Sequence, residues 1–312
     1  MKGSLAAPAA MAMASKSDAK EGNAASKPVE KPEALPQGKI GNLNVSRLLL
    51  GGNLLTHYTH SRDLKYVYNL AAHYNTVDKI LETLALAEEH GVNTLTVHTV
   101  PECQAILDKH RKERGGKMQW IICPTAPIEP GMKAYRKAVE ELVDNGTEAI
   151  YLWGVHADRL VAQGKMDLLA EAIAIPKELG VPSGIGAHDL NVVIQSEKHK
   201  IDNDFYIKTY HHHNYPTAPK PEEVKGPYKE FPGYWCADCN KTVEVMSKVE
   251  KPWIAFKVMA AGAIPPKDAF QHVFEHGADH ILAGMFDFEI EEDAAIIREA
   301  LLFADRERPW MS

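Results

Sequence analysis

The chain has few cysteines, no long apolar run and no excess of positive charge, and each absence excludes a class of protein. Only one pair among its four cysteines, Cys236 and Cys239, has the C-x-x-C spacing. A zinc ribbon needs two such pairs and is therefore excluded, whereas a disulfide within this pair stays open. The sequence has no apolar run long enough to cross a bilayer. The formal net charge of -7 argues against a nucleic-acid surface, which needs a basic patch.

What remains is an ordinary globular composition, with 45% hydrophobic and 25% charged residues in 312. Either one large α/β barrel or two smaller domains would fit this length. A small-molecule substrate is the partner that such a chain suggests, and the sequence does not set the oligomeric state.

Residues 1–36 differ from the rest. Residues 1–14 are small and weakly apolar, and Ala12 and Ala14 form the A-x-A pattern of a signal-peptide cleavage site. The stretch resembles the apolar part of a twin-arginine export signal, although no twin arginine precedes it in a chain that begins Met1-Lys2. We therefore expect a signal-like segment and linker over 1–36, one folded domain over 37–312, and an exported, periplasmic protein. An Ala-rich disordered tail on a cytoplasmic protein is the alternative.

Short apolar runs alternate with helical patterns along the folded part. A hairpin is expected around Gly41-Asn42, and eight buried strands follow. The expected strands cover residues 47–52, 93–98, 118–125, 149–156, 182–188, 205–211, 252–262 and 280–286. Each is followed by a segment with apolar residues at helical spacing. This order predicts a (β/α)8 TIM barrel with an N-terminal hairpin.

Four of these runs end on a histidine: His98, His156, His188 and His211. The carboxyl ends of parallel barrel strands meet on one face, so several imidazoles are expected there. Imidazole suits both proton transfer and metal binding near neutral pH. The pattern therefore predicts a site at the C-terminal face.

The order and spacing of motifs over 38–305 resemble the aldo-keto reductases. GNLNVSRLLLGG is similar to that family's opening hairpin and first strand, and GVPSGIGAHD and NDFYIKTYHHHNY are similar to its fifth and sixth strands. AIYLWGVHADRL and HILAGMFDFEIEEDAAI are similar to its fourth and eighth strands. The resemblance implies a TIM barrel and, in an ordinary member, NADPH-dependent reduction of a carbonyl group.

The catalytic tetrad that the resemblance implies (Asp, Tyr, Lys and His) is mostly absent. Thr96 stands at the Asp position, the following segment HTVPECQ has no Tyr, and Cys123 or Pro124 replaces the Lys. Only the fourth-strand histidine is retained, as His156. A packed histidine is the alternative role for His156.

The cofactor residues differ as well. Phe286 replaces the arginine that helps to hold the NADP phosphate, and Ile207 replaces the glutamine that holds the nicotinamide amide. We therefore do not expect NADP, and a reductase is the second choice. The segments GGNLLTHYTHSRDL and AFKVMAAGAI are similar to exported, largely uncharacterised bacterial proteins on this scaffold.

The first choice is an exported enzyme with a histidine-rich site for a divalent metal such as zinc or manganese. The expected ligands are His156, His188 and His211, and the expected catalytic groups are His156, Lys257 and Asp287. Lys257 lies in an apolar strand and must be paired or have a lowered pKa. Asp287 or Glu289 is its expected partner.

The expected substrate-binding residues are His60, Arg62 and Asp63 in the first loop, together with Trp153. A carbohydrate or another small polar molecule would suit such an aromatic-edged, polar mouth. The expected chemistry is that of a lyase, isomerase or hydrolase. An NADP-dependent oxidoreductase and a non-catalytic binding barrel are the alternatives.

Overall fold

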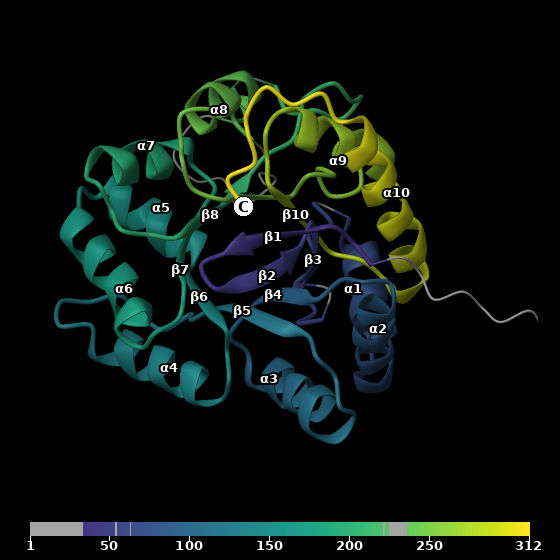
Figure 1. Cartoon of the computed structure of the whole chain (residues 1–312), viewed down its shortest axis with the longest axis horizontal. Helices are drawn as coiled ribbons and strands as arrows, with labels where there is room; N and C mark the ends of the chain where they lie inside the picture. The colour runs from purple at the N-terminus through teal and green to yellow at the C-terminus, as the bar shows by residue number, and fades with distance from the viewer. Residues whose placement is uncertain (1–33, 54, 63, 221, 225–235) are drawn as a thin grey trace, which may run out of the picture. The chain divides into compact units, whose positions relative to one another are not determined.

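Eight parallel strands close into a barrel in the order β10-β3-β4-β5-β6-β7-β8-β9. The strands are β3 (Leu48–Gly51), β4 (Thr94–His98), β5 (Gln119–Cys123), β6 (Ala149–Leu152), β7 (Ser183–Ala187), β8 (Phe205–Thr209), β9 (Trp253–Phe256) and β10 (His280–Ala283). Helices surround the ring of strands, as Figure 1 shows. The expected (β/α)8 barrel is confirmed.

This computed structural model describes residues 34–53, 55–62, 64–220, 222–224 and 236–312. The expected signal-like segment therefore lies almost wholly outside the described residues and stays a prediction. Within the described part, no helix is both long enough and apolar enough to cross a membrane.

The helices follow the expected periodicity. They are α1 (Lys65–Tyr74), α2 (Val77–Glu89), α3 (Pro101–Asp108), α4 (Lys133–Asp144), α5 (Gly154–Ala162), α6 (Met166–Glu178), α7 (Leu190–Lys198), α8 (Cys239–Met246), α9 (Pro266–Glu275) and α10 (Ile290–Phe303). A π-helical turn, η1 (Lys109–Glu113), extends α3, and a 3-10 turn, η2 (Asp287–Glu289), precedes α10. The helix α1 was not expected from the sequence.

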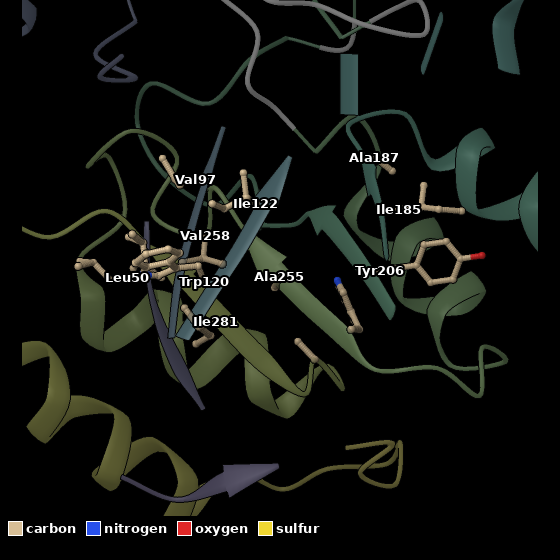
Figure 2. Close-up of a cluster of buried hydrophobic side chains, with 14 of the residues drawn as sticks. Leu50, Val97, Trp120, Ile122, Ile185, Ala187, Tyr206, Ala255, Val258 and Ile281 are labelled. Carbon is tan, nitrogen blue, oxygen red and sulfur yellow. The ribbon is translucent and has the colours of Figure 1, made fainter. Parts of the chain in front are cut away.

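Side chains alternate across the barrel wall. Leu49, Phe205 and Ile207 belong to the inner core, whereas Leu48 and Leu50 belong to the outer core beneath the helices. Figure 2 shows part of the outer core, with side chains from neighbouring strands packed together. Burying one such side chain fully stabilises the fold by roughly 1.5–3 kcal/mol.

The hairpin closes the N-terminal end of the barrel. Its strands, β1 (Gln37–Ile40) and β2 (Leu43–Ser46), pair antiparallel, and Ile40 and Val45 pack into the inner core. Figure 1 shows the hairpin across the ring of strands. The opposite, C-terminal face is thereby left as the place for a site.

The C-terminal segment also packs against the barrel through Arg308, whose side chain is buried. Its guanidinium donates to Asp279 Oδ2 at 2.8 Å and to the carbonyl oxygens of Gly277 and Val249 at 2.7 and 2.9 Å. Asp279 in turn accepts the backbone N–H of Trp253 at 2.9 Å. This ion pair joins the C-terminal segment to the start of β9.

Two predicted strand boundaries are wrong. The run 252–262 is a strand only as far as Phe256, where β9 ends, so Lys257 lies in the turn that follows and not in the strand. The run 149–156 is not a single strand, because β6 ends at Leu152 and α5 begins at Gly154. His156 therefore lies in the first turn of a helix. Pro176 is accommodated inside α6, near its C-terminal end.

Candidate functional site

The C-terminal ends of three strands bring His98, His188 and Phe256 to the same face of the barrel. His98 ends β4, Phe256 ends β9, and His188 directly follows β7. The alternation of the strands places all three at inward positions, since Val97 and Ala187 belong to the outer core and Phe256 packs on the inner one. The rings of His188 and Phe256 meet edge to face, with centroids 5.5 Å apart.

His188 is held by Asp158 of α5. Its Nδ1 lies 2.7 Å from Asp158 Oδ2, and Asp158 Oδ1 accepts the backbone N–H groups of His188 and Asp189 at 3.1 and 3.0 Å. The carboxylate is almost fully buried, whereas the imidazole is 15% exposed. Asp158 therefore fixes both the backbone and the ring of His188.

The space for this ring depends on Gly154, the first residue of α5. A Cβ atom there would lie 2.7 Å from Cε1 and 2.9 Å from Nδ1 of His188. The edge of the ring that carries these two atoms therefore faces α5. Nε2 is bonded to Cε1 and points away from Asp158, which holds Nδ1.

Lys208 lies under the same strand ends and is fully buried. Its Nζ donates to the carbonyl oxygens of His188 at 2.9 Å and Thr209 at 2.7 Å. Burial lowers the pKa of Lys208, while the nearby carboxylates of Asp158 and Asp189 favour its charged form. Lys208 thus ties the end of β7 to the end of β8.

The two partners of the His188–Asp158 pair have opposite pKa shifts. Burial, with the positive charges of Lys257 and Lys208, lowers the pKa of His188 well below its usual 6.5. Burial raises the pKa of Asp158 to about 7, although backbone N–H groups and both lysines oppose the rise. Both shifts disfavour an imidazolium–carboxylate ion pair, so the imidazole of His188 is neutral at neutral pH.

The first loop brings His60 to the same group. Burial is the main reason that its pKa lies well below 6.5, and Lys257, His188 and His98 lower it further. Its Nε2 lies 2.8 Å from the side-chain amide of Asn53. The expectation that His60 belongs to the C-terminal face therefore agrees with its neighbours.

The other first-loop residues are placed differently. Arg62, in a left-handed conformation, donates to the hydroxyl of Thr217 at 2.9 Å, and this contact is exposed. Asp63 lies outside the described residues. Tyr58 packs edge to face on His60 and His98, with centroids 5.6 and 6.0 Å away.

The turn after β9 has an unusual backbone. Lys257, Ala260 and Ala261 have φ values of 59°, 48° and 59°, and Gly262 has 82°. A non-glycine residue in the left-handed region costs roughly 1–3 kcal/mol and persists only where its surroundings impose it. Three such residues in one six-residue turn mark it as a constrained segment.

His211 is part of that constraint. It is fully buried, its Nδ1 donates to the carbonyl oxygen of Lys257 at 2.9 Å, and its Nε2 accepts the backbone N–H of Cys236 at 3.3 Å. Burial lowers its pKa to about 3. His211 therefore braces the turn as a neutral ring, and the expectation that it ligates a metal is wrong.

His156 does not face the other histidines from a strand end. It is buried in α5, packs edge to face on Trp153 at 5.3 Å, and its Nδ1 accepts from Arg159 at 2.9 Å. A neighbouring guanidinium opposes metal binding at that nitrogen. The aspartate near it in sequence, Asp158, holds His188 instead.

Asp287 has partners away from the histidines. Its carboxylate accepts from Tyr74 at 2.7 Å and pairs with Lys79 of α2 at 2.9 Å. Glu289 caps the backbone N–H of Phe286 at 2.8 Å. Both acids thus organise the start of α10, and a catalytic role for Asp287 stays an untested prediction.

The described residues include no group of three or more His, Cys, Asp or Glu side chains that could hold a metal ion. His156, His188 and His211 each have a ring nitrogen committed to another partner, as described above. Cys236 and Cys239 are both free thiols.

Comparison with known proteins identifies the scaffold. No family model and no curated protein matches the sequence. Among solved structures, an aldo-keto reductase from Bacillus halodurans in its holo form aligns with a TM-score of 0.56 and 12% identity over 88% of this chain and 98% of that one. A Pseudomonas aeruginosa protein described as a candidate aldo-keto reductase aligns with a TM-score of 0.55 and 15% identity over 85% and 95%. The chain has the aldo-keto reductase fold.

A further similar structure is a Gox0644 variant in complex with NADPH, with a TM-score of 0.55 and 9% identity over 88% of this chain and 93% of that one. Structures with this fold thus include reductases and an NADPH complex. The expectation of a metal-assisted lyase, isomerase or hydrolase is therefore wrong, as are the expected metal and the exclusion of NADP. These comparisons favour the alternative, an NADP-dependent oxidoreductase.

Sequence reasoning missed four residues of this site. Gly154 and Lys208 carry no motif, and Phe256 reads as an ordinary strand residue. Asp158 lies 30 residues from His188, so no local pattern pairs the two. The strand-end rule could have placed Phe256 beside His188.

Proposed function

We propose that the protein is an oxidoreductase that uses NADP(H) and acts on a small molecule at the C-terminal face of the barrel. The observation that carries this proposal is the constrained turn 257–262, on an aldo-keto reductase fold. β9 and β10 are the seventh and eighth strands of the barrel, counted from β3. In TIM barrels the loops after these two strands frequently form a phosphate site.

The residues present fit a dinucleotide in two respects. Lys257 supplies a positive charge, and the tight turn after it presents backbone N–H groups of the kind that bind anions. Phe256, directly before it, is a half-buried aromatic ring at an inward position, and it offers an apolar surface to a flat ring. When bound, the cofactor would supply a hydride acceptor or donor.

The segment after β10 is proposed to contribute less to phosphate binding than the corresponding segment of the aldo-keto reductases. Phe286 stands where an arginine was implied, and its N–H is already capped by Glu289. The phosphate contacts are therefore proposed to come from the turn after β9. His211 supports that turn through the Lys257 carbonyl oxygen.

Binding of NADPH to the purified protein tests the proposal, by cofactor fluorescence and by thermal unfolding. A free concentration of about one hundred times Kd stabilises a protein by about 2.7 kcal/mol, which corresponds to about 5 °C in Tm for a chain of this size. NADH in a parallel titration reports the contribution of the extra phosphate.

Lys257→Ala should weaken NADPH binding by about 10-fold to 150-fold, the equivalent of one hydrogen bond to a charged group. Lys200→Ala is the matched control, because Lys200 also has a left-handed backbone (φ 53°) but is exposed and follows α7. Wild-type protein that gives neither a fluorescence change nor a Tm shift would contradict the proposal and favour a non-catalytic barrel.

A further inference from the structure

We propose that His188, held by Asp158, is the base that takes the proton from a substrate hydroxyl, so that the enzyme oxidises an alcohol at neutral pH. This inference rests on the proposed function, because it needs an oxidised nicotinamide as the hydride acceptor. It assigns the proton transfer to a pair of residues that stands outside the tetrad of the resembled family.

The imidazole ring of His188 is held in a defined direction. Asp158 Oδ2 lies 2.7 Å from Nδ1, and the space that Gly154 leaves is filled by Cε1 and Nδ1. Because the two nitrogens point in different directions from the ring, Nε2 points away from Asp158, and Phe256 packs edge to face on the imidazole with centroids 5.5 Å apart. The turn after β9 begins directly after Phe256.

The pair of His188 and Asp158 is rigid. Asp158 accepts three hydrogen bonds, two of them from the backbone N–H groups of His188 and Asp189. Lys208 holds the carbonyl oxygen of His188 from the other side at 2.9 Å. The ring is therefore held before a substrate arrives, and such preorganisation is what a general base needs.

Charged and titratable groups surround the ring. From α5 it faces Asp158, from the start of α7 Asp189, from β8 Lys208, from the turn after β9 Lys257, and from the first loop His60. The two lysines and burial disfavour the imidazolium. With the proton on Nδ1, the neutral imidazole has a lone pair on Nε2 that can accept a proton, although these surroundings make it a weaker base than a free imidazole. An imidazole that is rarely protonated at neutral pH is poorly suited to donate a proton to a carbonyl.

The proposed oxidation removes one proton and one hydride from the alcohol. The hydroxyl O–H bond breaks and its proton forms a bond to Nε2 of His188. When bound, oxidised NADP would supply the acceptor for the hydride that the same carbinol carbon loses as its C–H bond breaks and its C=O bond forms. The proton then leaves His188 for solvent. Asp158 keeps its hydrogen bond to Nδ1 throughout.

Two experiments test the inference on the full chain. In the first, 15N-histidine NMR follows the tautomer and titration of His188 in wild type and in Asp158→Asn, with exposed His199 as the internal control. We expect a neutral His188 with the proton on Nδ1 and a pKa below the usual imidazole value. We expect the proton to move to Nε2 in Asp158→Asn.

In the second, NADP reduction is followed with a panel of ethanol, 1-phenylethanol, glycerol and xylitol, and NADPH oxidation with 4-nitrobenzaldehyde. We expect oxidation of at least one alcohol and a loss of 100-fold or more in kcat for His188→Ala, in the range of general base catalysis. NADPH binding should stay unchanged in that variant, and His199→Ala should behave as wild type.

The outcomes separate the two proposals. If NADPH does not bind, the proposed function fails, and the NMR titration alone still judges the state of His188. If NADPH binds but His188 titrates near 6.5 or prefers Nε2–H, the inference is overturned while the proposed function stands. The same holds if His188→Ala keeps its kcat, or if only 4-nitrobenzaldehyde is turned over. If nothing is turned over, the NMR result decides.

Discussion

Replacing Gly154 by alanine should disable the site without unfolding the barrel. The new Cβ would lie 2.7 Å from Cε1 of His188, where ordinary van der Waals contact begins at 3.4 Å, so the atoms must separate by 0.7 Å. Gly154 lies in the first turn of α5, after the end of β6 and before Asp158, the residue that holds His188. The imidazole ring of His188 can move, because it rotates about its Cα–Cβ and Cβ–Cγ bonds.

A ring displacement of about 0.7 Å would stretch the 2.7 Å contact between Nδ1 and Asp158 toward the limit of a hydrogen bond. A hydrogen bond to a charged group is worth about 1.5–3 kcal/mol. Alanine regains up to about 1 kcal/mol of helix propensity over glycine. The expected net loss in the free energy of unfolding is therefore small, about 1–2 kcal/mol.

The loss of function should be larger than this loss of stability. A misplacement of about 1 Å at a reacting group costs about 100-fold in rate. The assay is kcat for alcohol oxidation with NADP, beside urea unfolding and NADPH affinity, both of which should stay close to wild type. Gly164→Ala is the control: a Cβ there meets nothing within 4 Å, but its φ of +69° strains any other residue, so it should cost stability and leave kcat at the wild-type value. If Gly154→Ala keeps both the His188 tautomer and kcat, the assigned geometry is wrong.

Three further predictions concern residues outside that contact. Arg308→Met should lower the free energy of unfolding by about 3–5 kcal/mol in urea titrations, because it removes the nearer arginine partner of the buried Asp279 carboxylate and leaves Arg306 at 3.6 Å; a loss below about 1 kcal/mol would contradict this. His280 is fully buried with its pKa lowered to about 4, so the unfolded chain binds more protons below pH 6.5 and stability falls as the pH falls, by about 1.6 kcal/mol from pH 6.5 to pH 5. His280→Asn should remove that part of the slope, and equal slopes would refute it. His156→Ala should leave the tautomer and titration of His188 unchanged in the NMR experiment, and a change in either would show that the two histidines are coupled.

The barrel could be predicted from the sequence because its signals are local and repeated. Short apolar runs such as Leu48 to Leu50 recur along the chain, as do glycines that end helices, such as Gly91, Gly146 and Gly277, and each lies within a few residues of the element it defines. Where the local signal misled, the cause was also local: the apolar run 149–156 hides the point at which β6 ends and α5 begins.

The site could be predicted only in part. The strand-end rule placed His188 correctly, but it could not show that Asp158 reaches His188 across 30 residues. It also could not show that both ring nitrogens of His211 bond to backbone groups. Any imidazole can bind a metal ion. Whether a given histidine does so depends on which groups the fold places beside its ring nitrogens. The metal hypothesis failed on that difference.

The hairpin at the N-terminal end has a consequence for the order of events in turnover. Ile40 and Val45 fill that end, so a molecule that reaches His188 enters and leaves through the opposite face. A cofactor and a substrate that share one entrance cannot exchange independently, and the deeper one must arrive first and depart last. Steady-state kinetics should therefore follow a compulsory sequence, with competitive product inhibition only between the two forms of the molecule that binds first.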